Sequence, residues 1–143
     1  MSLLEIGAAF HHVGIACSDL DTDEAFFAAL GYRREREDID DEIQGVKARF
    51  MVGDGPRIEL VCNLEGRTVL SEFLRKGVKL YHVAYEVDDL DVAGEKLAAL
   101  GARQIGSVVP GIAFGMRKLV FFILPSTMLV EVISRHSETV GPS

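Results

Sequence analysis

One unit of sequence occurs twice in this chain, and the duplication restricts the fold more than any other feature. The stretch at residues 10–21 returns roughly 70 positions later, at residues 80–91. Three pairs of segments align without a gap: His12-Val13 with His82-Val83, Asp19-Leu20-Asp21 with Asp89-Leu90-Asp91, and Ala28-Ala29-Leu30-Gly31 with Ala98-Ala99-Leu100-Gly101. Internal repeats indicate copies of one structural module that bury a shared core. We expect the copies to pack about a pseudo-twofold axis, which would bring His12 and His82 toward each other.

The composition fits one compact domain and excludes several classes of function. The chain has 143 residues, of which 48% are hydrophobic, and each half alone is too small for a stable core. The net charge is −7 and the basic residues are scattered, so we expect no nucleic-acid partner. No apolar run approaches the roughly 20 residues of a membrane span, and no signal peptide is recognisable. Cys17 and Cys62 form no metal-binding pair by spacing, so we expect reduced thiols and a cytoplasmic location.

The first copy reads as a β-α-β-β-β module. Strands are expected at residues 9–17, 32–38, 46–52 and 57–62, and a helix at residues 21–30. Glu24 follows Asp21 by three positions, as in a capping box at the start of a helix. The acidic residues 39–42 read as a solvated loop, and residues 53–56 as a hairpin turn.

The second copy repeats this plan after a linker. We expect a linker helix at residues 68–76, strands at 80–87, 102–109, 117–124 and 128–134, and a helix at 91–100. The single domain therefore comprises module one (about 9–63), a linker (about 64–79), module two (about 80–134) and a polar tail (135–143). The predicted fold class is α+β, with two tandem βαβββ modules.

The metal site is predicted from the last strand of each copy. Glu59 and Glu131 each lie between aliphatic residues, so strand alternation turns both away from the face that packs on the helices. A carboxylate there is costly unless it is solvated, paired or bound to a metal ion. Together with His12 and His82, the two carboxylates form a mixed nitrogen and oxygen ligand set. Such a set suits one divalent ion, and Zn, Ni, Co, Mn and Fe(II) all remain open.

These features resemble the vicinal oxygen chelate superfamily, which includes glyoxalase I, methylmalonyl-CoA epimerases, extradiol dioxygenases and fosfomycin- or bleomycin-resistance proteins. The resemblance covers nearly the whole chain and rests on the paired modules and the four ligand positions. It implies that the two modules form a curved mixed sheet around a metal site. Within the superfamily, four phrases resemble the epimerases most: His12-Val13-Gly14-Ile15-Ala16, Gln44-Gly45-Val46-Lys47, Phe73-Leu74-Arg75-Lys76-Gly77 and His82-Val83-Ala84-Tyr85-Glu86-Val87-Asp88-Asp89.

The resemblance implies a metal-dependent isomerase or lyase that acts through a metal-chelated enediolate or enolate, either glyoxalase I-like or acyl-CoA epimerase-like. In that class the metal neutralises the charge that develops on the substrate oxygens. Glu131 is the implied catalytic base, and Glu59 is the implied base on the opposite face of the substrate carbon. The chain departs from the epimerases at Ile43, where they carry a Glu used in proton transfer, and at Tyr81, where they carry a His.

Two other classes remain open. A drug- or metabolite-binding protein of the resistance type would bind its ligand without catalysis, but such proteins typically lack the metal ligands. An Fe(II) dioxygenase would usually have two His and one Glu, so the second Glu argues for redox-neutral chemistry.

The substrate is expected to be a small anionic molecule. Gln44 belongs to a phrase shared with the epimerases and is a candidate substrate contact. Lys47 either meets an anionic substrate or pairs with the acidic loop. Arg117 follows a loop between Gly111 and Gly115; it either holds a substrate carboxylate or phosphate, or faces solvent. The resemblance also implies a homodimer.

Overall fold

The structure is a computed structural model that describes residues 7–136. The chain forms two compact units. The N-terminal unit is His12–His82; the C-terminal unit takes the described residues up to His11 together with those from Val83 onward. Strands β1 (Ala9–Ala16) and β6 (Leu80–Val87) contribute residues to both units. The part of the predicted polar tail at residues 137–143 lies outside the described residues.

The fold is α+β, as the sequence predicts, and its strands pair in a mixed sheet. Its strands follow the order β2-β4-β5-β1-β6-β9-β8-β7, and β3 also pairs with β4. Strands β1 and β5 run parallel, whereas the other registered pairs are antiparallel. None of the helices within residues 7–136 is long and apolar enough to cross a membrane.

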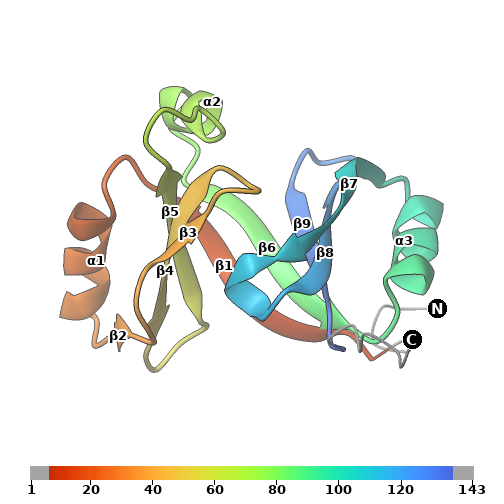
Figure 1. The fold of residues 1–143 in the computed structure, drawn as a ribbon, viewed down its shortest axis with the longest axis horizontal. Helices are drawn as coiled ribbons and strands as arrows, with labels where there is room; N and C mark the ends of the chain where they lie inside the picture. Colours follow the sequence, from red (N-terminus) through yellow and green to blue (C-terminus); the bar gives the residue numbers. More distant parts are fainter. Residues whose placement is uncertain (1–6, 137–143) are drawn as a thin grey trace. The chain divides into compact units, whose positions relative to one another are not determined.

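The N-terminal unit places one helix on one face of its strands. Its other elements are α1 (Leu20–Ala29), β2 (Arg33–Arg34), β3 (Ile39–Asp41), β4 (Val46–Val52), β5 (Ile58–Asn63) and α2 (Ser71–Arg75). Helix α1 lies against β4 and β5, and a core that includes Leu20, Ile58 and Leu60 fills the space between them (Figure 1). Period-2 alternation then directs Glu59 to the opposite face.

The C-terminal unit repeats this arrangement. Its other elements are α3 (Leu90–Ala99), β7 (Arg103–Gly111), a 3₁₀ turn (Ile112–Phe114), β8 (Arg117–Ile123) and β9 (Leu129–Ser134). Helix α3 contacts β7, β8 and β9, and its core includes Leu97, Phe122, Val130 and Val132. The predicted packing of the aliphatic neighbours of both Glu residues against the helices is therefore confirmed.

Three details of the predicted elements are wrong. Residues 39–41 form strand β3 rather than a solvated loop, because they pair antiparallel with β4. Helix α1 is capped by Asp19, not by Asp21: the Asp19 carboxylate accepts from the Asp21 amide at 3.1 Å. Glu24 takes no part in the cap and instead binds Arg34. Strand β2 is also shorter than predicted, with only Arg33 and Arg34 in the ladder.

Candidate metal centre

The N-terminal unit gathers two imidazoles and one carboxylate on the sheet face that points away from α1. Gly14 of β1 lies opposite Glu59 of β5, so His12, two residues before Gly14, shares its face. His82 extends from β6 toward the same place, and its ring approaches Gly14 closely. The three side chains are 0–7% exposed.

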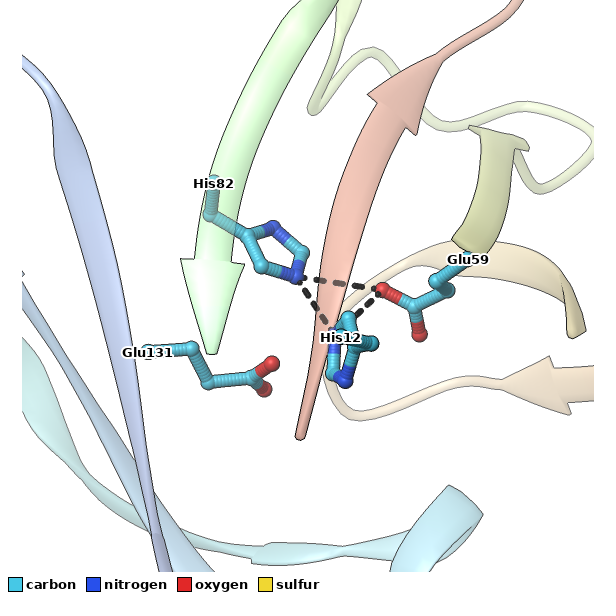
Figure 2. Close-up of side chains that lie close together, drawn as sticks. All are labelled: His12, Glu59, His82 and Glu131. Carbon is cyan, nitrogen blue, oxygen red and sulfur yellow. Dashed lines mark hydrogen bonds and ion pairs between the residues drawn. The ribbon is translucent and has the colours of Figure 1, made fainter. Parts of the chain in front are cut away.

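Ligand atoms of the three residues converge at one point (Figure 2). The Nε2 atoms of His12 and His82 are 2.9 Å apart. Glu59 Oε1 lies 3.3 Å from His12 Nε2 and 3.2 Å from His82 Nε2. The fourth side chain drawn, Glu131, belongs to the C-terminal unit.

The charge balance of this cluster keeps Glu59 anionic. Burial alone would raise the pKa of the Glu59 carboxyl, but the charges and hydrogen bonds of His12 and His82 outweigh it and hold that pKa well below its usual range. A carboxylate buried beside two imidazoles is stable only with positive charge nearby, supplied by an imidazolium or by a metal ion.

The spacing of the three ligand atoms fits a metal ion. Two bonds of about 2.1 Å that meet at a right angle place their donor atoms about 3.0 Å apart. The three separations of 2.9–3.3 Å match that value. Imidazole nitrogen with carboxylate oxygen is a donor set that Zn, Fe, Ni, Co and Mn accept. The cluster is therefore placed for metal binding, and the identity of the metal stays open.

Neighbouring residues fix the positions of both imidazoles. The His12 ring meets the buried Phe50 ring edge to face, with centroids 5.5 Å apart. The Tyr81 and His82 rings also meet edge to face, with their centroids 4.7 Å apart. A Cβ atom on Gly14 would lie 2.4 Å from His82 Cε1, so only glycine leaves room for this ring. Sequence reasoning missed the need for Gly14, which follows from its place opposite Glu59.

Glu131 occupies the equivalent position of the C-terminal unit. It lies on β9 opposite Phe121 of β8, just as Glu59 lies opposite Phe50. The residue is 2% exposed. Its neighbours Val130 and Val132 pack in the α3 core, so Glu131 projects from the other face.

Gln44 is joined to a buried carboxylate that the sequence reading assigned to a solvated loop. Asp41 is 3% exposed and accepts hydrogen bonds from the Gln44 amide at 2.9 Å and from Gln44 Nε2 at 3.0 Å. Burial raises the pKa of Asp41. Asp41 lies opposite Val46 in a register that places it on the same sheet face as Glu59. The alternation of the short strand β3 is the signal that would have identified Asp41.

Lys47 is not brought to the metal cluster. It lies opposite Cys62, on the α1 face of the sheet, while Glu59 projects from the other face. Its Nζ is 3.6 Å from Asp40 Oδ1, which agrees with the alternative that Lys47 pairs with the acidic segment.

Arg117 is held by its own unit. Its Nη1 donates to Glu86 Oε2 at 2.7 Å and to the Ser134 carbonyl at 3.2 Å, and its Nε donates to the Phe114 carbonyl at 3.0 Å. Register places Arg117 on the same face of β8 as Phe121, which lies opposite Glu131. Arg117 thus lies on the face of Glu131, with most of its donors already engaged.

Comparisons with known proteins agree with this architecture. Residues 11–121 match the family model of the Glyoxalase/Bleomycin resistance protein/Dioxygenase superfamily. The chain is 30% identical over 118 residues to an ethylmalonyl-CoA/methylmalonyl-CoA epimerase from Cereibacter sphaeroides, covering 78% of this chain and 84% of that protein.

Solved structures show the same fold. A hypothetical protein from Bacillus halodurans superposes with a TM-score of 0.75 at 22% identity, covering 92% of this chain and 97% of the other. The methylmalonyl-CoA epimerase of Mycobacterium tuberculosis gives a TM-score of 0.72 at 23% identity, with 90% and 89% covered. The repeat, the two histidines with their glutamate and the family match lead to one conclusion: the chain belongs to the Glyoxalase/Bleomycin resistance protein/Dioxygenase superfamily, the vicinal oxygen chelate superfamily.

Proposed function

We propose that this protein is an enzyme that moves a proton at the carbon next to the carbonyl group of an acyl-CoA thioester, as an epimerase does. The observation that carries this proposal is the triangle of His12, Glu59 and His82 donor atoms, 2.9–3.3 Å on a side. The similarity to an ethylmalonyl-CoA/methylmalonyl-CoA epimerase supports the CoA ester, which is also the small anionic substrate that the sequence predicts.

One divalent ion would be held by His12, Glu59, His82 and Glu131. Support for Glu131 as the fourth ligand comes from its repeat position and its burial. When bound, such an ion would stabilise negative charge on the substrate carbonyl oxygen and so lower the pKa of the adjacent carbon. Zn, Ni, Co, Mn and Fe(II) all suit this ligand set.

Glu131 is assigned as the base that takes the proton, and Glu59 as the group that serves the opposite face of the carbon. Both imidazoles lie within 3.3 Å of Glu59 Oε1 and hold this carboxylate in place. Gln44, held by Asp41, is the proposed hydrogen-bonding contact to the substrate. Arg117 is a further candidate for an anionic group of the substrate.

A glyoxalase I-like lyase is the second candidate, and one observation favours it. Ile43, at the position where the epimerases carry a proton-transfer Glu, is apolar and 45% exposed. A proton shift between adjacent carbons can use a single base on one face, whereas epimerisation needs groups on both faces. The choice of substrate therefore separates the two candidates.

Solvent deuterium exchange tests the proposal. In D₂O we expect deuterium to enter the α-carbon of methylmalonyl-CoA or ethylmalonyl-CoA. NMR spectroscopy measures this incorporation. Glu131→Gln should slow this exchange at least about 100-fold, because it removes the base. His136→Ala, at an exposed histidine outside the proposed ligand set, is the matched control and should exchange at the wild-type rate. Turnover of a glutathione hemithioacetal without exchange in either CoA ester would favour the lyase.

Metal content is measured alongside exchange. Mass spectrometry of the purified protein should find close to one divalent ion per chain, lost in His82→Ala and retained in His136→Ala. A wild-type protein that neither contains nor takes up a divalent ion would contradict the metal assignment. Exchange at the wild-type rate in Glu131→Gln would refute the role of Glu131.

A further inference from the structure

The outer face of the sheet, which packs against a helix in each unit, differs sharply between the two copies. Strand pairing shows which positions of the two copies are equivalent. Arg34 lies opposite Met51 in the first copy, and Gln104 lies opposite Phe122 in the second. Arg49 lies opposite Leu60, and Val120 lies opposite Val132, so Arg49 and Val120 are equivalent. The two helices align by the sequence repeat, so Asp21 corresponds to Asp91 and Glu24 to Gly94.

In the N-terminal unit a buried arginine occupies the space between helix and strands. Arg49 is 6% exposed and binds Asp38 through two hydrogen bonds of 2.8 Å. Its Nη1 donates to Asp21 Oδ1 at 2.8 Å and lies 3.4 Å from Glu24 Oε1. A pocket of about 230 Å³ remains beside Arg49 at the start of α1. The space therefore holds a guanidinium cation among three carboxylates.

In the C-terminal unit the corresponding residues leave a cavity. Gly94 replaces Glu24, Ala102 replaces Tyr32 and Val120 replaces Arg49, so each equivalent side chain is smaller. A cavity of about 440 Å³ opens between α3 and strands β7 and β8 at these residues. Its apolar lining includes Val120 and Phe122. The volume lies in the usual range for a small-ligand site.

Acidic side chains line this cavity, but among the described residues none equivalent to the Arg49 cation of the first copy accompanies them. Asp91 is retained at the position of Asp21, and Glu95 is added one turn later on the same side of α3. Within residues 7–136, no lysine, arginine or histidine lies within ion-pair distance of either carboxylate. In the first copy the counterpart of Asp91, Asp21, binds the guanidinium group of Arg49, which indicates a planar or compact cation as the partner of this carboxylate.

We propose that the cavity under α3 binds a small organic cation, an amidinium, guanidinium or ammonium group carried on an apolar body. Asp91 and Glu95 attract the cation, and the more accessible lining residues Leu90 and Val108 contact the apolar body. Both carboxylates are exposed to solvent, so we expect their charge-assisted hydrogen bonds to favour the charged ligand over a neutral one of the same shape by a modest factor. This site belongs to the C-terminal unit alone and is independent of the metal centre and of its reaction.

The test compares two probes of nearly identical shape. Benzamidine carries an amidinium cation and benzamide a neutral amide. Titration into ¹⁵N-labelled full-length protein, followed by amide chemical shifts, should give a millimolar dissociation constant for benzamidine, as expected for a fragment of this size. Benzamide should bind at least about fivefold weaker. The shifted amides should lie in α3, at the start of β7 and in β8.

Variants of the cavity locate the binding. Asp91→Asn combined with Glu95→Gln should remove the preference for benzamidine, whereas Asp54→Asn in an exposed turn should leave it unchanged. Ala102→Tyr, which installs the residue of the first copy, should abolish binding of both probes. Equal affinity for the two probes, no binding of benzamidine, shifts elsewhere in the chain, or unchanged preference in the double variant would each overturn the proposal. If Ala102→Tyr does not fold, the double variant decides alone.

Discussion

The two copies of the repeated module carry similar residues on the sheet face away from the helices and different residues on the face that packs against the helices. On the face away from the helices, Glu59 lies opposite Phe50 in the first copy and Glu131 opposite Phe121 in the second. On the helix face, Arg49 of the first copy corresponds to Val120 of the second. The first copy thus holds its helix partly with ion pairs, whereas the second relies on apolar contacts.

This difference separates two demands on one fold. Metal chemistry requires particular donor atoms, which agrees with the same residue types at the proposed ligand positions of the two copies. Packing a helix on a sheet requires only that buried groups be compensated, and a satisfied ion-pair network or an apolar cluster can each do so. Substitutions on the helix face should therefore change stability, and substitutions on the other face should change metal binding.

The largest effect is expected at Arg49. Arg49→Met removes the cation that faces three carboxylates and leaves their charges close together. Removal of one partner from a buried ion pair costs about 3–5 kcal/mol, and the exposure of Asp21 and Glu24 reduces that figure to about 3 kcal/mol here. Urea unfolding followed by circular dichroism measures the change.

Val120→Met is the matched substitution in the second copy. It adds volume to an apolar wall beside a cavity, so we expect the free energy of unfolding to fall by less than about 1.5 kcal/mol. Equal losses in Arg49→Met and Val120→Met would contradict the idea that ion pairs hold the first helix.

A smaller effect is expected from Gly14→Ala, which probes the other face. The equivalent residue of the second copy is already alanine, Ala84, so strand geometry permits the change. The added Cβ would lie 2.4–2.7 Å from atoms of the His82 ring and must displace it. We expect metal affinity to fall at least tenfold and the free energy of unfolding to fall by about 2 kcal/mol.

Ala84→Gly is the mirror-image control. It should cost about 1 kcal/mol through backbone entropy and leave metal affinity unchanged, because it adds no atom near either imidazole. Wild-type metal affinity in Gly14→Ala would show that the His82 ring position is not critical.

Much of the fold was predictable because the repeat and the strand alternation agree. Strands β4 and β6 have the bounds that their apolar periodicity predicts. Strand β3 was missed because its alternation is hidden in an acidic run, and a buried Asp41 looks unfavourable in sequence. The hydrogen bonds from Gln44 that compensate it depend on a turn geometry that composition does not reveal.

The proposed ligand positions follow from the sequence for the same reason, whereas the surroundings of Lys47 and Arg117 do not. Equivalent positions in the two copies identify His12, His82 and the two glutamates without any knowledge of register. The face on which Lys47 lies depends on its pairing with Cys62, and the partners of Arg117 come from β6 and β9. Such pairings between distant strands leave no mark in the local sequence.

The smallest effect is expected at Asp38 and depends on pH. Hydrogen bonds from Arg49 hold the pKa of the Asp38 carboxyl below its usual value of about 3.9, although burial opposes this. Because the folded-state pKa is the lower one, the stabilisation is complete above the unfolded-state pKa and is lost as the pH falls through the folded-state pKa. At any pH between 5 and 8, Asp38→Asn should therefore lower the free energy of unfolding by about 1 kcal/mol.

Below about pH 3.9 the stability of Asp38→Asn should converge on that of the wild type, whose Asp38 is then being protonated as well. Urea unfolding at pH 7, 5, 4 and 3 measures this convergence, with Glu37→Gln at the exposed neighbouring residue as the control that changes stability by less than about 0.5 kcal/mol at each pH. A difference that persists undiminished at pH 3 would assign the loss to packing of the Asn side chain. The ion pair would then contribute little, and the helix layers of the two copies would be held by the same apolar contacts after all.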